Sequence, residues 1–227
     1  DLAFGLPFYD DFENGLYRWI QWGDAGNDAL IFEDPVFECN YSVGMFSNEN
    51  VPPYLQNDSM LRHYFDAVQG VHVSTWFNME RYGIGDNPGS WGAGCAAQVS
   101  IGNRIDGHLT IAVNDDGRVR WIPARGSHDY DNYLSDLRLD LNTWYQYDIY
   151  YVDGILSVTV RDEQGEVLIH GTADCLDMDI EYTDIGSFAL SDDGYSYFDN
   201  FSIEECDQVP EPQISIEPET INFGEAD

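Results

Sequence analysis

Short segments in which apolar and polar residues alternate recur along the whole chain. This two-residue period predicts β-strands that bury one face, and no long stretch shows the 3.6-residue period of an amphipathic helix. The clearest predicted strands span residues 30–32, 44–47, 60–65, 71–79, 96–101, 108–113, 118–123, 144–152, 155–161, 166–170, 187–191 and 197–203. Residues 114–117, 152–154 and 162–165 have the Asn, Asp and Gly content that tight hairpins require.

Many short strands joined by tight turns predict an all-β fold, an antiparallel jelly-roll β-sandwich. The chain of 227 residues has no linker in its middle, so we expect one domain over residues 1–206. A proline-containing linker follows at 207–213. Residues 214–227 are predicted to form an extended strand outside the sandwich.

This last segment alternates again, with apolar side chains at Ile214, Ile216, Ile221 and Phe223. Two interpretations are open. The segment looks like the first strand of the immunoglobulin-like domains that follow such linkers in large bacterial surface proteins. Alternatively, it is a strand donated to a neighbouring copy of the chain, because a sheet edge readily accepts another strand.

The formal net charge is −33, from 42 acidic and 9 basic residues, and every basic residue is an arginine. Such a surface repels nucleic acid and anionic lipid, so neither is an expected partner. Three explanations of the acidity are open: adaptation to high salt, collection of divalent cations, and solubility of an exported protein. The 43% apolar and 15% aromatic content nevertheless favours a folded core.

Four cysteines, Cys39, Cys95, Cys175 and Cys206, are widely spaced and form no metal-thiolate pattern. Their even number favours two disulfides in an oxidising compartment, with reduced core cysteines as the alternative. No apolar run approaches the roughly 20 residues of a membrane helix, so we expect no membrane insertion. The missing initial Met fits a mature exported protein or an excised fragment. We therefore expect a secreted or cell-surface location.

Two similar acidic, aromatic segments stand at the ends of the predicted domain. Residues 8–15 read Phe-Tyr-Asp-Asp-Phe-Glu-Asn-Gly, and residues 196–204 read Ser-Tyr-Phe-Asp-Asn-Phe-Ser-Ile-Glu. Pairing of these two strands would bring Asp11, Glu13 and Asp199 close together. Clustered carboxylates repel one another unless a hard cation such as calcium lies between them. The alternative is that they cap turns and strand ends without any metal.

These two motifs, with Thr-Trp-Tyr-Gln-Tyr-Asp-Ile at 143–149 and Leu-Ser-Val-Thr-Val at 156–160, give residues 8–205 a recognisable pattern. The pattern resembles concanavalin A-like jelly rolls, which include laminin G-like modules, legume-type lectins and laminarinases, and it is also similar to jelly-roll carbohydrate-binding modules. The resemblance implies a secreted bacterial or archaeal surface protein. It also implies a structural calcium ion held by Asp11 or Glu13, by the carbonyl of Gly44 and by Asp199.

A hydrolase of the laminarinase type needs a Glu-x-Asp-x-Glu or Glu-x-Asp-x-x-Glu triplet. Alternation along one strand then places the nucleophile and the acid/base on the same face. No glutamate begins such a triplet, and the partial match at Glu205 and Asp207 lacks the second glutamate. Serine nucleophile elbows, phosphate-binding glycine loops and paired zinc histidines are also absent from the sequence. We therefore expect that the chain is not an enzyme.

Sugar binding needs aromatic platforms with amide and carboxylate groups beside them, and the segments 80–91 and 125–133 combine these residue types. Tryptophans in strand-like segments are expected to belong to the core; these are Trp19, Trp22, Trp76, Trp121 and Trp144. The remaining aromatic candidates for a glycan site are Tyr82, Trp91, Tyr130 and Tyr133.

Three functional hypotheses follow. The first is a non-catalytic, calcium-stabilised extracellular module that binds glycans or acts in adhesion within a larger surface assembly. The second is a subunit of an extracellular filament, a homopolymer joined by donation of the C-terminal strand. The third is a polysaccharide hydrolase or lyase with a divergent site.

Overall fold

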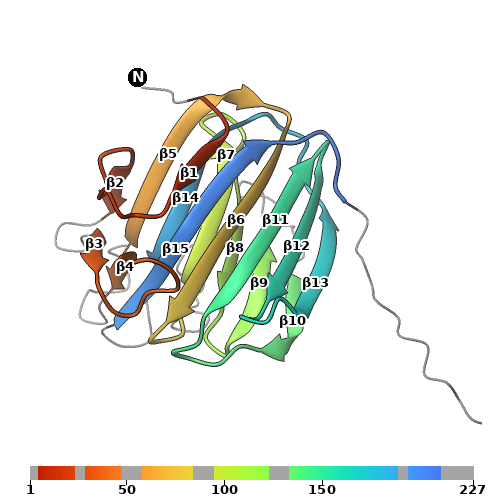
Figure 1. Ribbon diagram of the computed structural model, residues 1–227. Helices are drawn as coiled ribbons and strands as arrows, with labels where there is room; N and C mark the ends of the chain where they lie inside the picture. The colour runs from red at the N-terminus through yellow and green to blue at the C-terminus, as the bar shows by residue number, and fades with distance from the viewer. Residues whose placement is uncertain are drawn as a thin grey trace, which may run out of the picture.

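A computed structural model describes residues 5–23, 29–47, 58–83, 95–122, 133–188 and 194–210 (Figure 1). Within these ranges the chain forms strands and no helix, and the strands build two antiparallel sheets that pack face to face. The expected all-β, antiparallel sandwich is therefore confirmed. Among the described residues, no helix reaches the length and apolar character that crossing a bilayer requires.

The first sheet has eight strands and contains both ends of the described chain. In spatial order its strands are β13 (Val167–Asp174), β12 (Ile155–Arg161), β11 (Tyr145–Val152), β6 (Gly70–Met79), β15 (Gly194–Glu205), β4 (Ser42–Ser47) and β3 (Ala29–Phe32), with β1 (Phe8–Asp10) beside β15. Strands β6, β11 and β15 lie toward the viewer in Figure 1.

The second sheet has seven strands and lies behind the first in Figure 1. In spatial order its strands are β10 (Tyr133–Arg138), β9 (Arg118–Ile122), β8 (Gly107–Val113), β7 (Cys95–Asn103), β14 (Ile180–Phe188), β5 (Asp58–Val68) and β2 (Ile20–Gly23). Each strand alternates between a core-facing side and an outer side, so the outer face of this sheet carries every second residue.

The core lies between the two sheets and is rich in aromatic side chains. Its largest fully buried members are Phe8, Phe12, Phe77, Tyr147, Tyr151, Phe198 and Phe201. Rings of Phe77 and Tyr147 from β6 and β11 stack with their centroids 4.0 Å apart. Aromatic packing of this kind stabilises the sandwich beyond the apolar area that it buries.

The acidic segments at the two ends of the domain pair as expected, with Phe8 opposite Ile203 and Asp10 opposite Phe201. The predicted strand at 187–191 is wrong in its placement, because β14 spans Ile180–Phe188. Strands β2 and β10 were not expected. Buried polar residues on both sides of β14 hide its apolar alternation, and β2 and β10 are short edge strands without a strong pattern.

Three of the expected core tryptophans, Trp19, Trp121 and Trp144, are buried. The expectation for Trp76 is wrong, because Trp76 lies on the outer side of β6, where the ring of Phe37 stacks on it at 3.7 Å. The side chain of Trp22 lies outside the described residues. The loop that contains Phe37 thus covers the outer face of β6 by stacking on Trp76.

Cys39, Cys175 and Cys206 are free thiols, and the side chain of Cys95 lies outside the described residues. No disulfide joins the described cysteines. The segment 214–227, with the predicted partner strand, also lies outside the described residues.

Candidate functional site

The outer face of the seven-stranded sheet carries a buried ion pair. Arg62 on β5 points outward because its neighbours Leu61 and His63 face the interior. It donates two hydrogen bonds to Asp184 on β14, from Nε to Oδ1 (2.6 Å) and from Nη2 to Oδ2 (2.7 Å). Burial disfavours the guanidinium charge, but the bonds to Asp184 outweigh burial and raise the pKa of Arg62. The pair therefore stays ionised.

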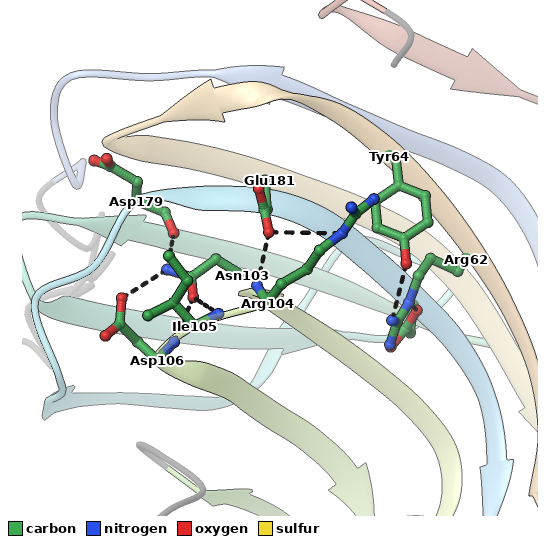
Figure 2. Close-up of polar contacts among 9 residues, drawn as sticks. Arg62, Tyr64, Asn103, Arg104, Ile105, Asp106, Asp179 and Glu181 are labelled. Carbon is green, nitrogen blue, oxygen red and sulfur yellow. Dashed lines mark hydrogen bonds and ion pairs between the residues drawn. The ribbon is translucent and has the colours of Figure 1, made fainter. Parts of the chain in front are cut away.

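Two tyrosines enclose this arginine, as Figure 2 shows for Tyr64. The Tyr64 hydroxyl accepts a hydrogen bond from Nη1 of Arg62 (3.2 Å), and the Tyr182 ring lies 3.9 Å from the guanidinium carbon. A second guanidinium, that of Arg104, lies over the ring of Tyr64, 4.6 Å from its centroid. Burial raises the pKa of Tyr182 to about 12, so its phenol is protonated at neutral pH.

The hairpin between β7 and β8 holds Arg104 at this position. The side chain of Asn103 accepts a hydrogen bond from the amide of Ile105 (2.9 Å) and donates one to the carbonyl of Asp179 (2.8 Å). The carboxylate of Glu181 accepts a hydrogen bond from the Arg104 amide (2.7 Å; Figure 2). These bonds attach the hairpin that carries Arg104 to β14 and to the residue before it.

A chain of polar side chains crosses the middle of the same face. Gln98 and Ser100 point outward on β7, because Val99 between them and Ile101 after them belong to the core. Gln98 donates to the Ser100 hydroxyl (2.9 Å), which bonds the hydroxyl of Thr110 on β8 (3.1 Å). Ser100 and Thr110 are only 1% and 7% exposed. The longer side chains around them therefore form the accessible surface.

Arg120 stands at the β9 side of this polar chain. It points outward between the core residues Val119 and Trp121, and it pairs across the ladder with Ala112 of β8. Its Nε atom is buried without a hydrogen-bond partner, and no described carboxylate lies within ion-pair distance of its guanidinium. The register shift between β7 and β8 leaves Ala97 and Gln98 opposite the single residue Ala112. The small Ala112 thus separates an amide from a cation that no described acid neutralises.

The predicted metal ligand Glu13 instead binds backbone amides. Its carboxylate accepts hydrogen bonds from the amides of Asn40 (2.7 Å) and Tyr41 (2.8 Å) and from the Asn40 side chain (2.9 Å). The bonds from Asn40 lead those that lower the pKa of Glu13. Glu13 therefore holds the 33–41 loop against the start of the chain.

Asp199 binds the same loop from β15. Its Oδ2 atom accepts hydrogen bonds from the amides of Phe37 (3.0 Å) and Glu38 (3.1 Å), and its Oδ1 accepts one from Asn200 (2.8 Å). Burial raises the pKa of Asp199, with the neighbouring Glu13 charge adding to the effect. The structure therefore brings Glu13 and Asp199 to one loop, the segment 33–41, through backbone amides.

The other two predicted ligands differ in place. Asp11 accepts a hydrogen bond from the Glu13 amide (3.2 Å), beside the same cluster. Gly44 lies within the ladder opposite Tyr197, which precedes Asp199 by two residues. The oxygen donors suit a hard cation, yet among the described residues no three His, Cys, Asp or Glu side chains are arranged to hold one. As they lie, these residues are satisfied by amides and do not form an ion cage, so calcium stays a prediction.

The predicted glycan-binding aromatics are only partly described. Tyr82 is half-buried, donates a hydrogen bond to the Leu139 carbonyl (2.6 Å) and packs on Gly117, so its contacts are structural. Trp91 and Tyr130, and the side chain of Tyr133, lie outside the described residues.

Sequence reasoning missed the arginines of the seven-stranded sheet. Five of the nine arginines lie on its strands or in the β7–β8 hairpin: Arg62, Arg104, Arg118, Arg120 and Arg138. A signal was present, because Arg118 and Arg120 alternate with core residues in a chain that has no lysine. Their gathering on one sheet depends on strand order, which the alternation does not reveal.

No protein-family model matches the sequence, and no curated protein matches it. Solved structures do match. An endo-β-1,4-glucuronan lyase from the fungus Trichoderma reesei has a TM-score of 0.64 at 12% identity, covering 88% of this chain and 95% of the lyase. The cellulose-induced protein Cip1 has a TM-score of 0.65 at 14% identity, covering 90% and 100%. Lectin I-B4 from Griffonia simplicifolia has 0.52 at 11% identity, covering 89% and 100%. The fold is shared with lectins and a polysaccharide lyase.

This likeness supports the expected concanavalin A-like fold and corrects one expectation. The prediction that the chain is not an enzyme is wrong as it stands, because the fold that it adopts also serves a lyase. The missing glutamate triplet excludes only one kind of glycoside hydrolysis. Elimination chemistry does not depend on that triplet.

Proposed function

We propose that the outer face of the seven-stranded sheet binds a polysaccharide that carries carboxylate groups. The observation that carries the proposal is the guanidinium of Arg120, which has no carboxylate partner among the described residues of a chain with 42 acidic residues. A guanidinium that no described acid neutralises can pair with the carboxylate of a ligand. Glycan binding also agrees with the lectins of this fold, and a carboxylated chain agrees with the glucuronan lyase.

The chemistry around Arg120 suits a uronate. A guanidinium binds a carboxylate through two parallel hydrogen bonds, which are stronger than bonds between neutral groups. The amide of Gln98 stands across Ala112, two strand spacings or about 10 Å from Arg120. One face of the site thus offers a charge for the carboxylate and an amide for sugar hydroxyls.

The net charge of −33 opposes this ligand at long range. Electrostatic interactions between exposed charges farther apart than about 10 Å are largely screened at 0.1 M salt. A direct contact between a guanidinium and a carboxylate is screened much less when it is partly buried. Other arginines of the sheet are paired with acids, such as Arg118 with Asp116 at 2.7 Å. Recognition therefore depends on Arg120 rather than on a positive surface.

Affinity electrophoresis in gels that contain polyuronates or neutral glucans tests this function. We expect retardation in polyuronate gels, and we expect Arg120→Gln to weaken binding about tenfold or more, since a hydrogen bond to a charged group contributes about 1.5–3 kcal/mol. Arg138→Gln is the matched control, because Arg138 lies on the next strand, is exposed and pairs with Asp116. Equal binding by Arg120→Gln and the parent protein would reject the assignment.

A second candidate is cleavage of the same polymer by elimination, supported by the lyase of this fold. In that reaction a base takes the proton from the carbon next to the carboxylate, and the C–H electron pair forms a carbon–carbon double bond. The C–O bond breaks, and the leaving oxygen departs with its electron pair and takes up a proton. Arg120 would stabilise the negative charge that develops on the carboxylate. Ultraviolet absorbance of unsaturated sugar ends measures the activity, and its absence with every polyuronate tested leaves binding as the function.

Four further predictions from the sequence remain proposals. They are calcium binding, adhesion, an extracellular location and a filament joined by Ile214, Ile216, Ile221 and Phe223. Size-exclusion chromatography with and without residues 211–227 tests the filament, because removal of the donated strand is expected to abolish polymers.

A further inference from the structure

The outer face of the eight-stranded sheet carries a histidine between two carboxylates. His72 lies on β6, and the adjoining strands place Tyr150 of β11 on one side of it and Glu204 of β15 on the other. Asp148 stands two residues before Tyr150 on the same outer side of β11. Four ionisable groups from three neighbouring strands therefore meet on the sheet opposite to the one that carries Arg120.

Both ring nitrogens of His72 contact carboxylate oxygens. Nδ1 lies 3.0 Å from Oε1 of Glu204, and Nε2 lies 2.5 Å from Oδ1 of Asp148. An ionised carboxylate only accepts hydrogen bonds, and a neutral imidazole has one donor nitrogen. Two carboxylate contacts therefore require a proton on each nitrogen, which is the imidazolium form.

An aromatic ring and a second cation also surround this histidine, and only the two carboxylates favour its charged form. The ring of Tyr150 stacks on His72 with centroids 4.1 Å apart and planes 1° apart, and Arg161 of β12 lies 3.8 Å from the other oxygen of Asp148. Burial disfavours the charged ring, but the bonds to Asp148 and Glu204 outweigh it and raise the pKa of His72. The half-buried thiol of Cys206 is a further titratable group close to Tyr150.

We propose that His72 is a pH-sensitive latch that, as an imidazolium between Asp148 and Glu204, holds the C-terminal end of β15 on the sheet. The contact lies at the C-terminal end of β15, so it acts on the last residues of that strand. Directly after Glu204 and Glu205, the amide of Cys206 makes a 3.1 Å hydrogen bond to Gly70 at the start of β6, and the described chain then leaves the sandwich. The latch thus ties β15 by a side chain just before that exit.

The direction of the pH effect follows from the raised pKa. An unfolded histidine titrates near 6.5, so the latch is fully closed below that pH and opens as pH rises through the higher pKa of the folded state. Loss of the proton leaves two facing carboxylates around a neutral ring. The end of β15 then loses this side-chain tie and is held there by its backbone ladder to β6 alone.

The test uses the whole chain and two readouts. In ¹⁵N NMR at about pH 6, both ring nitrogens of His72 are expected to carry protons. Amide exchange of Glu205 and Cys206, corrected for the intrinsic pH dependence, is expected to rise about tenfold between about pH 6 and pH 9, which is about 1.4 kcal/mol, the scale of one charged hydrogen bond.

His72→Gln is expected to remove this pH dependence and leave fast exchange at both pH values. His170→Gln is the matched control, because His170 lies on the same sheet, exposed, with its ring bonded to Thr159. It is expected to keep the parent behaviour. A singly protonated His72 ring at about pH 6, or an unchanged pH dependence in His72→Gln, would overturn the proposal.

Discussion

Replacement of Asp184 by asparagine tests how the arginine face is held together. The Asp184→Asn change keeps the shape of the side chain but removes its charge. In the native protein Asp184 is 4% exposed and Arg62 is 19% exposed, and two hydrogen bonds of 2.6 and 2.7 Å join them. After the change, the guanidinium of Arg62 stays between Tyr64 and Tyr182 without this counter-charge.

The size of the loss follows from this burial. Removing one partner of a buried ion pair costs about 3–5 kcal/mol, because the remaining charge loses the attraction of that partner while it stays buried. Arg62 keeps some contact with water, which favours the lower end, about 3 kcal/mol. For a chain of this length, 1 kcal/mol shifts the melting temperature by about 2–4 °C. Thermal unfolding followed by circular dichroism should therefore show a fall of about 6–12 °C.

The control is Glu181→Gln, in the same view of the sheet (Figure 2). Glu181 pairs with Arg104 at 4.0 Å, with the two side chains 31% and 53% exposed, so its charge contributes less than about 1 kcal/mol. Glutamine also keeps the oxygen that accepts from the Arg104 amide. Equal melting temperatures for Asp184→Asn and Glu181→Gln would refute the claim that the first pair is a buried ion pair.

Three further predictions use other parts of the chain. Gly171→Ala is expected to destabilise by about 1–3 kcal/mol in urea unfolding, because a Cβ there would lie 2.5 Å from the Trp121 ring; unchanged stability would contradict this close packing. If calcium binds near Asp199, a chelator lowers the melting temperature and added calcium restores it. A melting curve that the chelator leaves unchanged would contradict calcium binding. Polyuronate affinity, measured by titration calorimetry, is expected to rise between about 0.01 and 0.1 M salt, since screening shortens the repulsion from about 30 to 10 Å. A steady decrease would contradict the local role of Arg120.

Much of the sandwich follows from alternation alone. Strands such as β6 and β11 have a buried residue at every second position, so the chain pattern specifies both the strand and its inner face. The extent of strand β14 was not predicted from the sequence, because its outward residues Tyr182 and Asp184 are buried as well as its inward residue Thr183. Alternation reveals a strand only where one face is solvated.

The candidate site was less predictable, because it depends on strand order. The sequence places Asp184 far from Arg62, and only the pairing of β14 with β5 sets them opposite each other. The same holds for His72, which meets Glu204 through the pairing of β6 with β15. The pairing of the first and last strands was predictable, because their similar motifs stand at the two ends of the domain, whereas the binding of the 33–41 loop by Glu13 and Asp199 was not predicted.

The arginines of the seven-stranded sheet have two different roles, which the composition alone does not distinguish: some pair with acids, and Arg120 has no acidic partner among the described residues. Arg62 pairs with Asp184, and Arg118 and Arg138 share Asp116, so each of these arginines already has an acidic partner in the sheet. Only an arginine without a counter-ion adds attraction at contact, and Arg120 meets that condition among the residues that the structure describes. Surface acids far from the site should therefore change how fast a charged polymer approaches, which depends on salt, whereas Arg120 changes how long it stays. Association and dissociation rates measured separately would distinguish the two, because neutralising distant acids should alter mainly the first and Arg120→Gln mainly the second.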